Sequence, residues 1–284
     1  MSSPKITARV ERLFVYPIKS CAGVELGEAV LTETGLDLDR AWMVVDQRGE
    51  FVTQRELPRM ALIRPQLKVH EVVLRAPGML ALHLQIDAVE EPAQVRIWGD
   101  LVSAYDMGPI AAQWFSDFLG QPLRLVRFDP EHRRLSSPQW TDGVDAPNQF
   151  SDGFPLLVLS QASLDLFNEK LSLSGDAPVG MERFRPNLVL SGLDAHDEDR
   201  VALLEISAAV PVLLKPVKPC SRCPIPDIDP GTAQIDPAVG RTLRSYRSNE
   251  RLNGAVSFGM NLIILQGVDQ TLKVGQSVTA NFQV

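Results

Sequence analysis

Short runs of apolar residues, broken every few positions by glycine, proline or charge, dominate the first part of the chain. Between residues 6 and 16, Val10, Leu13 and Val15 alternate with polar neighbours until Pro17, which is the pattern of a half-buried strand. Similar runs follow at 29–34, 41–46, 61–69, 71–75, 80–86 and 94–98. Strands at this spacing suit a small antiparallel barrel, so we predict that the first domain is mainly β.

Helical spacing is confined to a few segments. Apolar side chains at near-helical intervals predict one helix over residues 110–119, which Gly120 ends. A second helix is predicted to begin at Ser160 or Ser163, either of which can cap it, and to reach about Leu171. The chain is therefore expected to be mainly β with a few helices, an α+β fold.

Further strands are predicted in the second half of the chain. They lie at 123–128, 156–159, 188–190 and 201–214, and the last run divides into two short strands. The runs 262–265 and 272–278 resemble a hairpin that closes the fold. Residues 129–148, in contrast, are polar, contain proline and show no periodicity, so we expect a mobile surface loop there.

Length and composition indicate a globular protein with two domains. The chain has 284 residues, of which 45% are hydrophobic and 22% charged, so neither disorder nor a fibrous repeat is indicated. We predict domains at 5–125 and 126–284. The formal net charge of −7 argues against general binding to nucleic acid or an anionic membrane. Any site for an anion is therefore expected to be a pocket.

The cysteine content and the N-terminal sequence both bear on location. Three cysteines are too few for a disulfide scaffold, so a reducing cytoplasm is the expected compartment. Residues 1–11 contain no apolar stretch of signal-peptide length, and no run of 18 apolar residues occurs. We therefore expect neither secretion nor membrane spanning.

The stretch from Lys215 to Gly231 has the most unusual composition of the chain. It contains five prolines, at positions 216, 219, 224, 226 and 230. Proline fixes φ and lacks the N–H donor, so we predict a stiff loop that is neither a helix nor a central strand. Cys220 and Cys223 lie in it, and Arg222 between them can lower a thiol pKa or bind an anion.

This spacing of cysteines leaves three kinds of chemistry open. A zinc site needs four ligands, and only Cys21 and four scattered histidines could complete one. A thioredoxin-like dithiol is expected at the start of an amphipathic helix, and none is predicted after Cys223. The third possibility is a single thiolate that ligates a soft metal carried by a cofactor.

Other candidate anion-binding residues lie where predicted strands end or begin. Lys19 and Ser20 directly follow the first strand, although a solvated lysine at a strand end is the simpler interpretation. Arg40 precedes a buried strand and could pair with Asp37 or Asp39 instead of a ligand.

Two more groups of candidates lie further along the chain. The turn with Gly153 and Phe154 can present backbone N–H groups or simply lead into a strand. Arg185 and Asn187 can likewise be ligand contacts or a turn cap.

Several motifs in the same order resemble the MOSC family, named for the C-terminal domain of molybdenum cofactor sulfurase. The resemblance is greatest to the form with an added N-terminal β-barrel domain, as in the mitochondrial amidoxime-reducing component and bacterial reductases of N-hydroxylated compounds. It covers nearly the whole chain. The motifs are Tyr16-Pro17-Ile18-Lys19-Ser20-Cys21, Asp39-Arg40-Ala41-Trp42, Gln54-Arg55, Phe150-Ser151-Asp152, Leu159-Ser160-Gln161-Ala162-Ser163-Leu164, Phe184-Arg185-Pro186-Asn187 and Cys220-Ser221-Arg222-Cys223.

The resemblance implies a fold, a cofactor and a set of site residues. The fold would be an N-terminal MOSC-type β-barrel followed by a β-barrel MOSC domain, and the cofactor would be molybdenum-molybdopterin. Cys223 would be the metal ligand and the catalytic residue, whereas Cys220 and Cys21 would not be ligands. The molybdopterin would be held by Lys19, Ser20, Arg40, Gly153, Phe154, Arg185, Asn187, Ser221 and Arg222.

The implied activity is reduction of a small N-hydroxylated substrate by removal of the N–O oxygen. We expect neither the membrane anchor of the mitochondrial members nor the iron–sulfur domain of some bacterial ones. Electrons are therefore expected from a separate protein, a ferredoxin-like protein or a flavin reductase. Two alternatives stay open: sulfur transfer through a persulfide on Cys223, and a molybdenum-cofactor carrier without catalysis.

Overall fold

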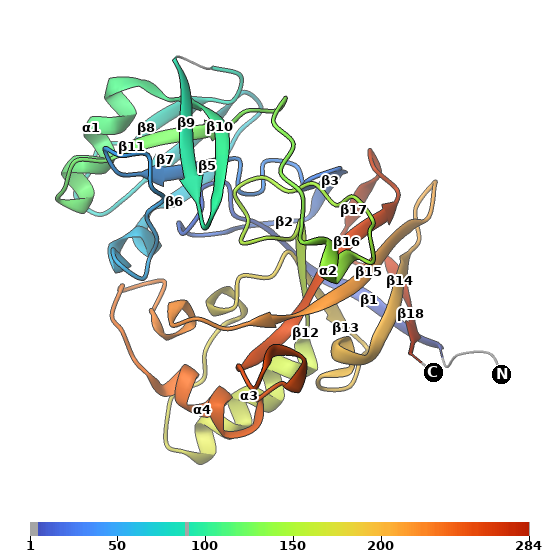
Figure 1. Ribbon diagram of the computed structural model, residues 1–284. Coiled ribbons are helices and arrows are strands. Elements are labelled where there is room, and N and C mark those ends of the chain that lie inside the picture. Colours follow the sequence, from blue (N-terminus) through green and yellow to red (C-terminus); the bar gives the residue numbers. More distant parts are fainter. Residues whose placement is uncertain (1–4, 89–90, 284) are drawn as a thin grey trace.

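The centre of the fold is a closed barrel of seven strands. The computed structural model describes residues 5–88 and 91–283 (Figure 1). The strands pair in the order β13-β12-β16-β15-β14-β18-β1, and β13 also pairs with β1, which closes the ring. Their bounds are β1 Lys5–Val15, β12 Leu156–Ser160, β13 Leu188–Ser191, β14 Val201–Ile206, β15 Val212–Ser221, β16 Ser257–Gln266 and β18 Ser277–Phe282.

Burial along β1 shows how the sequence specifies the barrel. Ala8 and Val10 are buried, whereas the alternating residues Thr7 and Arg9 are exposed, as expected for a strand with one face toward a core. The interior is filled by aliphatic side chains from every barrel strand, among them Val158, Leu204 and Leu262. The short strand β2 (Val24–Leu26) extends the sheet beside β1.

Two smaller sheets and a helix form most of the N-terminal part. A four-stranded sheet has the order β5-β11-β10-β9, and a three-stranded sheet has the order β6-β7-β8. Side chains from both sheets and from helix α1 share one core, which includes Trp42, Val72 and Phe115. The bounds are β5 Trp42–Val45, β6 Arg64–Leu67, β7 Glu71–Arg75, β8 Leu82–Gln85, β9 Pro92–Ile97, β10 Asp100–Asp106, β11 Arg124–Phe128 and α1 Gly108–Leu119.

The remaining elements cover the barrel. Helices α3 and α4 share a core with the outside of the barrel, formed in part by Phe167, Leu243 and Phe258. A further small sheet has the order β17-β3-β4. Bounds are α2 Pro138–Thr141, α3 Gln161–Leu173, α4 Ala238–Tyr246, β3 Glu28–Thr32, β4 Gly35–Leu36 and β17 Thr271–Lys273; short 3₁₀ helices are η1 Pro58–Leu62, η2 Met181–Arg183, η3 Asp197–Arg200, η4 Ile225–Asp227 and η5 Glu250–Leu252.

The predicted fold class and most predicted elements are confirmed. The described chain is mainly β with four α-helices, and the runs at 71–75, 123–128 and 188–190 are strands β7, β11 and β13. Of the two candidate caps for α3, Ser160 caps the helix, because its side chain accepts the N–H of Ser163. No helix in the described part of the chain is both long and apolar enough to cross a membrane.

The prediction of a stiff loop over Lys215–Gly231 is wrong for its first part, which belongs to β15. Strand β14 pairs with β15 only over Val212–Leu214, so beyond that point one edge of β15 is free of strand partners among the described residues. Register shifts at Pro216 and Pro219 accommodate the missing N–H donors on the other edge, toward β16. Proline is tolerated here because the central strand has become an edge strand.

One other expectation needs correction, and one stays untested. The runs 262–265 and 272–278 do not form a hairpin. The first lies in β16, which pairs with β12 and β15. The second covers β17, which pairs with β3, and the start of β18, which lies between β1 and β14. The segment 129–148 contains helix α2 and buries Arg134, whose guanidinium donates to Asp100, Asn148 and two backbone carbonyls. The mobility of this segment stays a prediction. The domain boundaries at 5–125 and 126–284 also stay predictions, although β1 from the first range pairs with strands of the second in the barrel.

Gly259 in β16 provides a test of how tightly the barrel strands approach. Its φ is +81°, and a Cβ there would lie 2.7 Å from the carbonyl oxygen of Val158 in β12. We expect Gly259→Ala to lower the free energy of unfolding by about 2–4 kcal/mol, because strain and a backbone clash add together.

Gly78 is the matched control for this prediction. Its φ is +77°, but nothing lies within 4 Å of a Cβ at that position. Gly78→Ala should therefore cost only about 1–2 kcal/mol from the left-handed backbone alone. Urea unfolding followed by circular dichroism measures both, and equal losses would contradict the predicted close approach.

Candidate functional site

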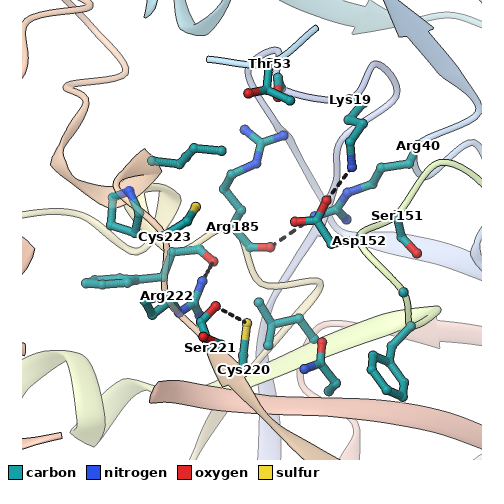
Figure 2. Close-up of a pocket in the computed structure, with 18 of the residues that line it drawn as sticks. Lys19, Arg40, Thr53, Ser151, Asp152, Arg185, Cys220, Ser221, Arg222 and Cys223 are labelled. Atoms are coloured by element: carbon teal, nitrogen blue, oxygen red, sulfur yellow. Dashed lines mark hydrogen bonds and ion pairs between the residues drawn. The ribbon is translucent and has the colours of Figure 1, made fainter. Parts of the chain in front are cut away.

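All ten predicted site residues line one cavity of about 370 Å³ (Figure 2). They come from segments far apart in the sequence, namely the chain after β1, the loop just before β5, the turn before β12, the segment before β13, and the end of β15 with the two residues that follow it. The residues are Lys19, Ser20, Arg40, Gly153, Phe154, Arg185, Asn187, Ser221, Arg222 and Cys223. Their proximity is a structural fact, whereas their binding roles stay predictions.

Lys19 is buried at the cavity wall and is not a solvated lysine. Only 6% of the residue is exposed, and its backbone N–H donates to the carbonyl of Trp42. Its ammonium donates to the carbonyl of Phe150 at 2.9 Å and to the carboxylate of Asp152. Burial lowers the pKa of Lys19, and Asp152 opposes this by favouring the charged form.

Two arginines of the cavity lie over one aromatic ring. The Cζ atoms of Arg40 and Arg185 are 4.3 Å and 4.2 Å from the ring centroid of the buried Tyr16. The negative face of an aromatic ring attracts guanidinium groups, and the attraction is strongest where water is excluded. Tyr16 therefore holds two like charges close together.

Further contacts fix these two arginines. Arg40 donates to the carboxylate of Asp39, which is one of the two partners that the sequence suggested for it. Arg40 also lines the cavity. Arg185 donates to the carbonyl of Cys21 at 2.7 Å. Burial, together with the charge of Arg40, lowers the pKa of Arg185 to about 10, so it stays protonated at neutral pH.

Several residues of the cavity have an unusual backbone. Ser20, Arg40 and Arg185 have φ values of 67°, 51° and 57°, in the left-handed region that non-glycine residues seldom occupy. Such strain persists only where the surrounding contacts determine the conformation, and it concentrates at functional sites. The carbonyl of Arg185 accepts from Arg40, which links two of these residues directly.

Arg222 fastens the segment that carries Cys223. Its guanidinium donates to the carbonyls of Phe258 and Phe184, and its backbone N–H donates to Val256. Backbone carbonyls thus satisfy much of its donor capacity while its charge remains uncompensated by a carboxylate of the described chain. Arg222 consequently positions the end of β15 and adds positive charge to the cavity.

Asn187 has a similar double role. Its side chain accepts the N–H of Leu157 and donates to the carbonyl of Phe14, which joins β12 to β1 at the wall of the cavity. The residue is 1% exposed. Most of its hydrogen-bonding capacity is used within the barrel, so any contact with a ligand would use what remains of its amide group.

The three cysteines have different environments. All are free thiols, and Cys223 and Cys220 are half-buried and line the cavity. Burial raises the pKa of Cys220, and it raises the pKa of the fully buried Cys21 to about 12. Within the described residues, no group of three or more histidine, cysteine or acidic side chains is placed to hold a metal ion.

Four further charged residues line the cavity although they were not among the predicted site residues, namely Arg55, Asp152, Arg183 and Lys218. Arg55 and Asp152 stand in motifs of the MOSC resemblance, whereas Arg183 and Lys218 do not. The guanidinium of Arg55 stacks on Trp98, with Cζ 5.0 Å from the ring centroid, and the Lys218 ammonium lies near the rings of Trp140 and Phe154. Asp152 could have been identified from its position directly before Gly153. A carboxylate in a turn that is predicted to bind an anion would repel that anion, so its presence there needs another explanation.

Positive charge dominates the cavity of this acidic protein. Seven described cationic side chains line it, against one carboxyl group, that of Asp152; the cations are Lys19, Arg40, Arg55, Arg183, Arg185, Lys218 and Arg222. Among the described residues only Lys19, Arg40 and Arg183 of these form ion pairs with carboxylates. The arrangement is suited to an anion with several charged or polar groups.

Comparison with known proteins identifies the family. Residues 7–122 match the model of the MOSC N-terminal beta barrel domain, and residues 145–279 match that of the MOSC domain. Human mitochondrial amidoxime-reducing component 1 is 36% identical over 283 residues, covering 95% of this chain and 82% of the human protein. The chain belongs to the MOSC family.

Two further relatives and one solved structure show different extents of similarity. Human mitochondrial amidoxime reducing component 2 is 36% identical over 248 residues, or 84% of this chain and 72% of that protein. Molybdenum cofactor sulfurase of Danio rerio is 30% identical over 88% of this chain but only 31% of its own length. The YUAD protein structure from Bacillus subtilis covers 99% of this MOSC chain at 12% identity, with a TM-score of 0.43.

Thiol labelling tests the different environments of the cysteines. With a pKa raised to about 12 by burial, Cys21 is almost entirely in the unreactive thiol form at pH 8, at a thiolate fraction of about 10⁻⁴. We expect iodoacetamide to modify Cys223 in the folded, cofactor-free protein and to leave Cys21 unmodified, as measured by peptide mass spectrometry. Unfolding in urea should expose all three thiols, and labelling of Cys21 at the rate of Cys223 before unfolding would contradict its burial.

Proposed function

We propose that this protein is a molybdenum-cofactor oxidoreductase that reduces N-hydroxylated compounds with electrons from a separate redox protein. The observation that carries the proposal is that the Cys223 thiol opens into the same cavity as seven cationic side chains. The proposal is supported by relatives named as amidoxime-reducing components that align over most of the chain.

The residues present fit a phosphate-bearing pterin. Four lining cations, Arg55, Arg185, Lys218 and Arg222, have no carboxylate partner among the described residues, which suits an anion bound from outside. A cavity of about 370 Å³ lies within the range of small-molecule sites. A thiolate at the cavity wall is the type of ligand that soft metals prefer.

The chain would supply binding, orientation and charge, and the cofactor, when bound, would supply the two-electron redox chemistry. Lys19, Arg40 and Arg185 would hold the anionic part, and Ser20, Ser221 and the turn at Gly153 and Phe154 would offer polar contacts. Cys223 would hold the metal while Arg222 keeps its segment against β16. Removal of the N–O oxygen as water consumes two electrons and two protons.

The donor of these electrons and the location of the reaction are part of the proposal. A ferredoxin-like protein or a flavin reductase is the class of partner that delivers electrons to such a site. A cytoplasmic location is supported by the three free thiols, which suit a reducing compartment. The substrate is proposed to be a small N-hydroxylated molecule, such as an amidoxime.

Sulfur transfer is a second candidate, and one observation favours it. The relative from Danio rerio that is named molybdenum cofactor sulfurase aligns with 88% of this chain. In that case Cys223 would carry a persulfide, which adds the mass of one sulfur atom to its peptide. Mass spectrometry of the unreduced protein distinguishes this function from the proposed reductase.

Replacing Cys223 tests the proposed reductase. Cys223→Ser removes the thiolate that would hold the metal, so we expect reduction of benzamidoxime to fall by about a hundredfold or more. Reduced viologen supplies the electrons in this assay, so that the result does not depend on the partner protein. Molybdenum and pterin contents of the purified protein are measured in parallel and should be about one per chain in the wild type.

Cys220→Ser is the matched control for the Cys223 variant. Cys220 lies three residues earlier in the same segment and also lines the cavity, but its thiol is not the proposed ligand. We expect its activity to stay within about threefold of wild type. Full activity of Cys223→Ser, or equal losses in both variants, would refute the assigned role of Cys223.

A further inference from the structure

Asp152 occupies the cavity in a way that the proposed binding of an anion does not explain. Its carboxylate is the one acidic group among the described residues that line the cavity, and it lies close to Lys19 and Arg40 (Figure 2). Its side chain is 65% exposed, whereas that of its partner Lys19 is 7% exposed. The ammonium is therefore fixed in the wall while the carboxylate projects into the open cavity.

The charges around Asp152 keep it ionised. Partial loss of solvent inside the cavity would raise its pKa, but the positive charges of Lys19, Arg55 and Arg40 outweigh this and hold the pKa well below its usual range. At neutral pH the carboxylate is consequently an anion that is paired with Lys19 and lies in the field of Arg40 and Arg55. A second anion that approaches Lys19 meets this carboxylate first.

We propose that Asp152 is a built-in competitor that keeps free inorganic phosphate from occupying the cavity and yields only to a larger phosphate-bearing ligand. The inference rests on the proposed function, because it takes the cavity to be an anion site. Asp152 then determines which anions can bind, and it is not one of the residues that hold them.

The physical basis is competition within one molecule. Asp152 belongs to the chain, so its carboxylate competes at an effective concentration that a free ion must overcome. Inorganic phosphate can reach only the cations close to Lys19, so it gains few new contacts when it displaces Asp152 from Lys19. A larger ligand that also contacts Arg185 and the segment of Ser221 gains additional charge-assisted hydrogen bonds, which offset the release of Asp152.

Asp152 could alternatively be a brace that positions Lys19 for the ligand. The two roles predict effects of opposite sign. Removal of a competitor strengthens the binding of phosphate, because Lys19 becomes free to pair with it. Removal of a brace weakens binding or leaves it unchanged, because a mispositioned Lys19 contributes less.

The experiment measures phosphate binding to the full-length chain, produced in a host that cannot make molybdopterin. Isothermal titration calorimetry at constant ionic strength compares the wild type with Asp152→Asn, which removes the charge and keeps the size. We expect inorganic phosphate to bind Asp152→Asn about tenfold more tightly than wild type. Asp152→Ala serves as a second variant with the same expectation, and the 65% exposure of this side chain means that neither change opens a buried cavity.

Asp142→Asn is the matched control. Asp142 also pairs with a lysine, Lys215, and its side chain is 74% exposed, but it does not line the cavity. This variant changes the net charge by the same amount and should bind phosphate as the wild type does. An equal gain in Asp142→Asn would assign the effect to net charge and overturn the inference.

A double variant tests whether the effect passes through Lys19. When Lys19→Gln is already present, Asp152→Asn should bring less than about a twofold gain, because no ammonium is left to release. Unchanged or weaker phosphate binding in Asp152→Asn and Asp152→Ala would refute the competitor role. The proposed function fails separately, through absence of molybdenum from the purified protein, so the two failures can be distinguished.

Discussion

The structure around the cavity depends on keeping positive charges together in a protein whose formal net charge is −7. Carboxylates alone do not achieve this, because a full set of ion pairs would neutralise the site. Arg185 lies over the ring of Tyr16 and donates to the carbonyl of Cys21, and Arg222 donates to the carbonyls of Phe184 and Phe258. Arg40 shares the same ring but pairs with Asp39. For Arg185 and Arg222 these neutral partners satisfy donors and leave the charge available, which is the condition for binding an anion from solution.

The closed barrel is what brings these groups together. Lys19 follows β1, Arg185 precedes β13 and Cys223 follows β15, so ends of three barrel strands surround the cavity. Arg40 and Arg55 are added by the chain around β5, outside the barrel. No single segment could form the site, and a change in barrel register would separate the thiol from the cations.

Much of the site could be predicted, but from several motifs in order and not from single residues. A lysine and a serine after a strand, and Arg222 between two cysteines, are compatible with anion and thiolate chemistry, but local sequence left simpler interpretations open. The resemblance of the motifs to the MOSC family assigned these residues to one site. The strand at Pro216 and the pairing of Asp152 with Lys19 could not be predicted in this way. Both depend on partners far away in the sequence. The end of β14 decides whether the edge of β15 at Pro216 is free, and the position of Lys19 decides whether the charge of Asp152 is paired.

Closure of the barrel by its first and last strands also affects the order of biosynthesis. Strand β18 pairs with β1 from Lys5 opposite Asn281 to Arg9 opposite Ser277, so the pairing spans almost the whole chain. Such non-local contacts form late, and during translation β1 has no β18 partner until the C-terminal residues leave the ribosome. The barrel is therefore closed only after β18 has been synthesised, and a large cofactor that needs the closed barrel would enter after that point.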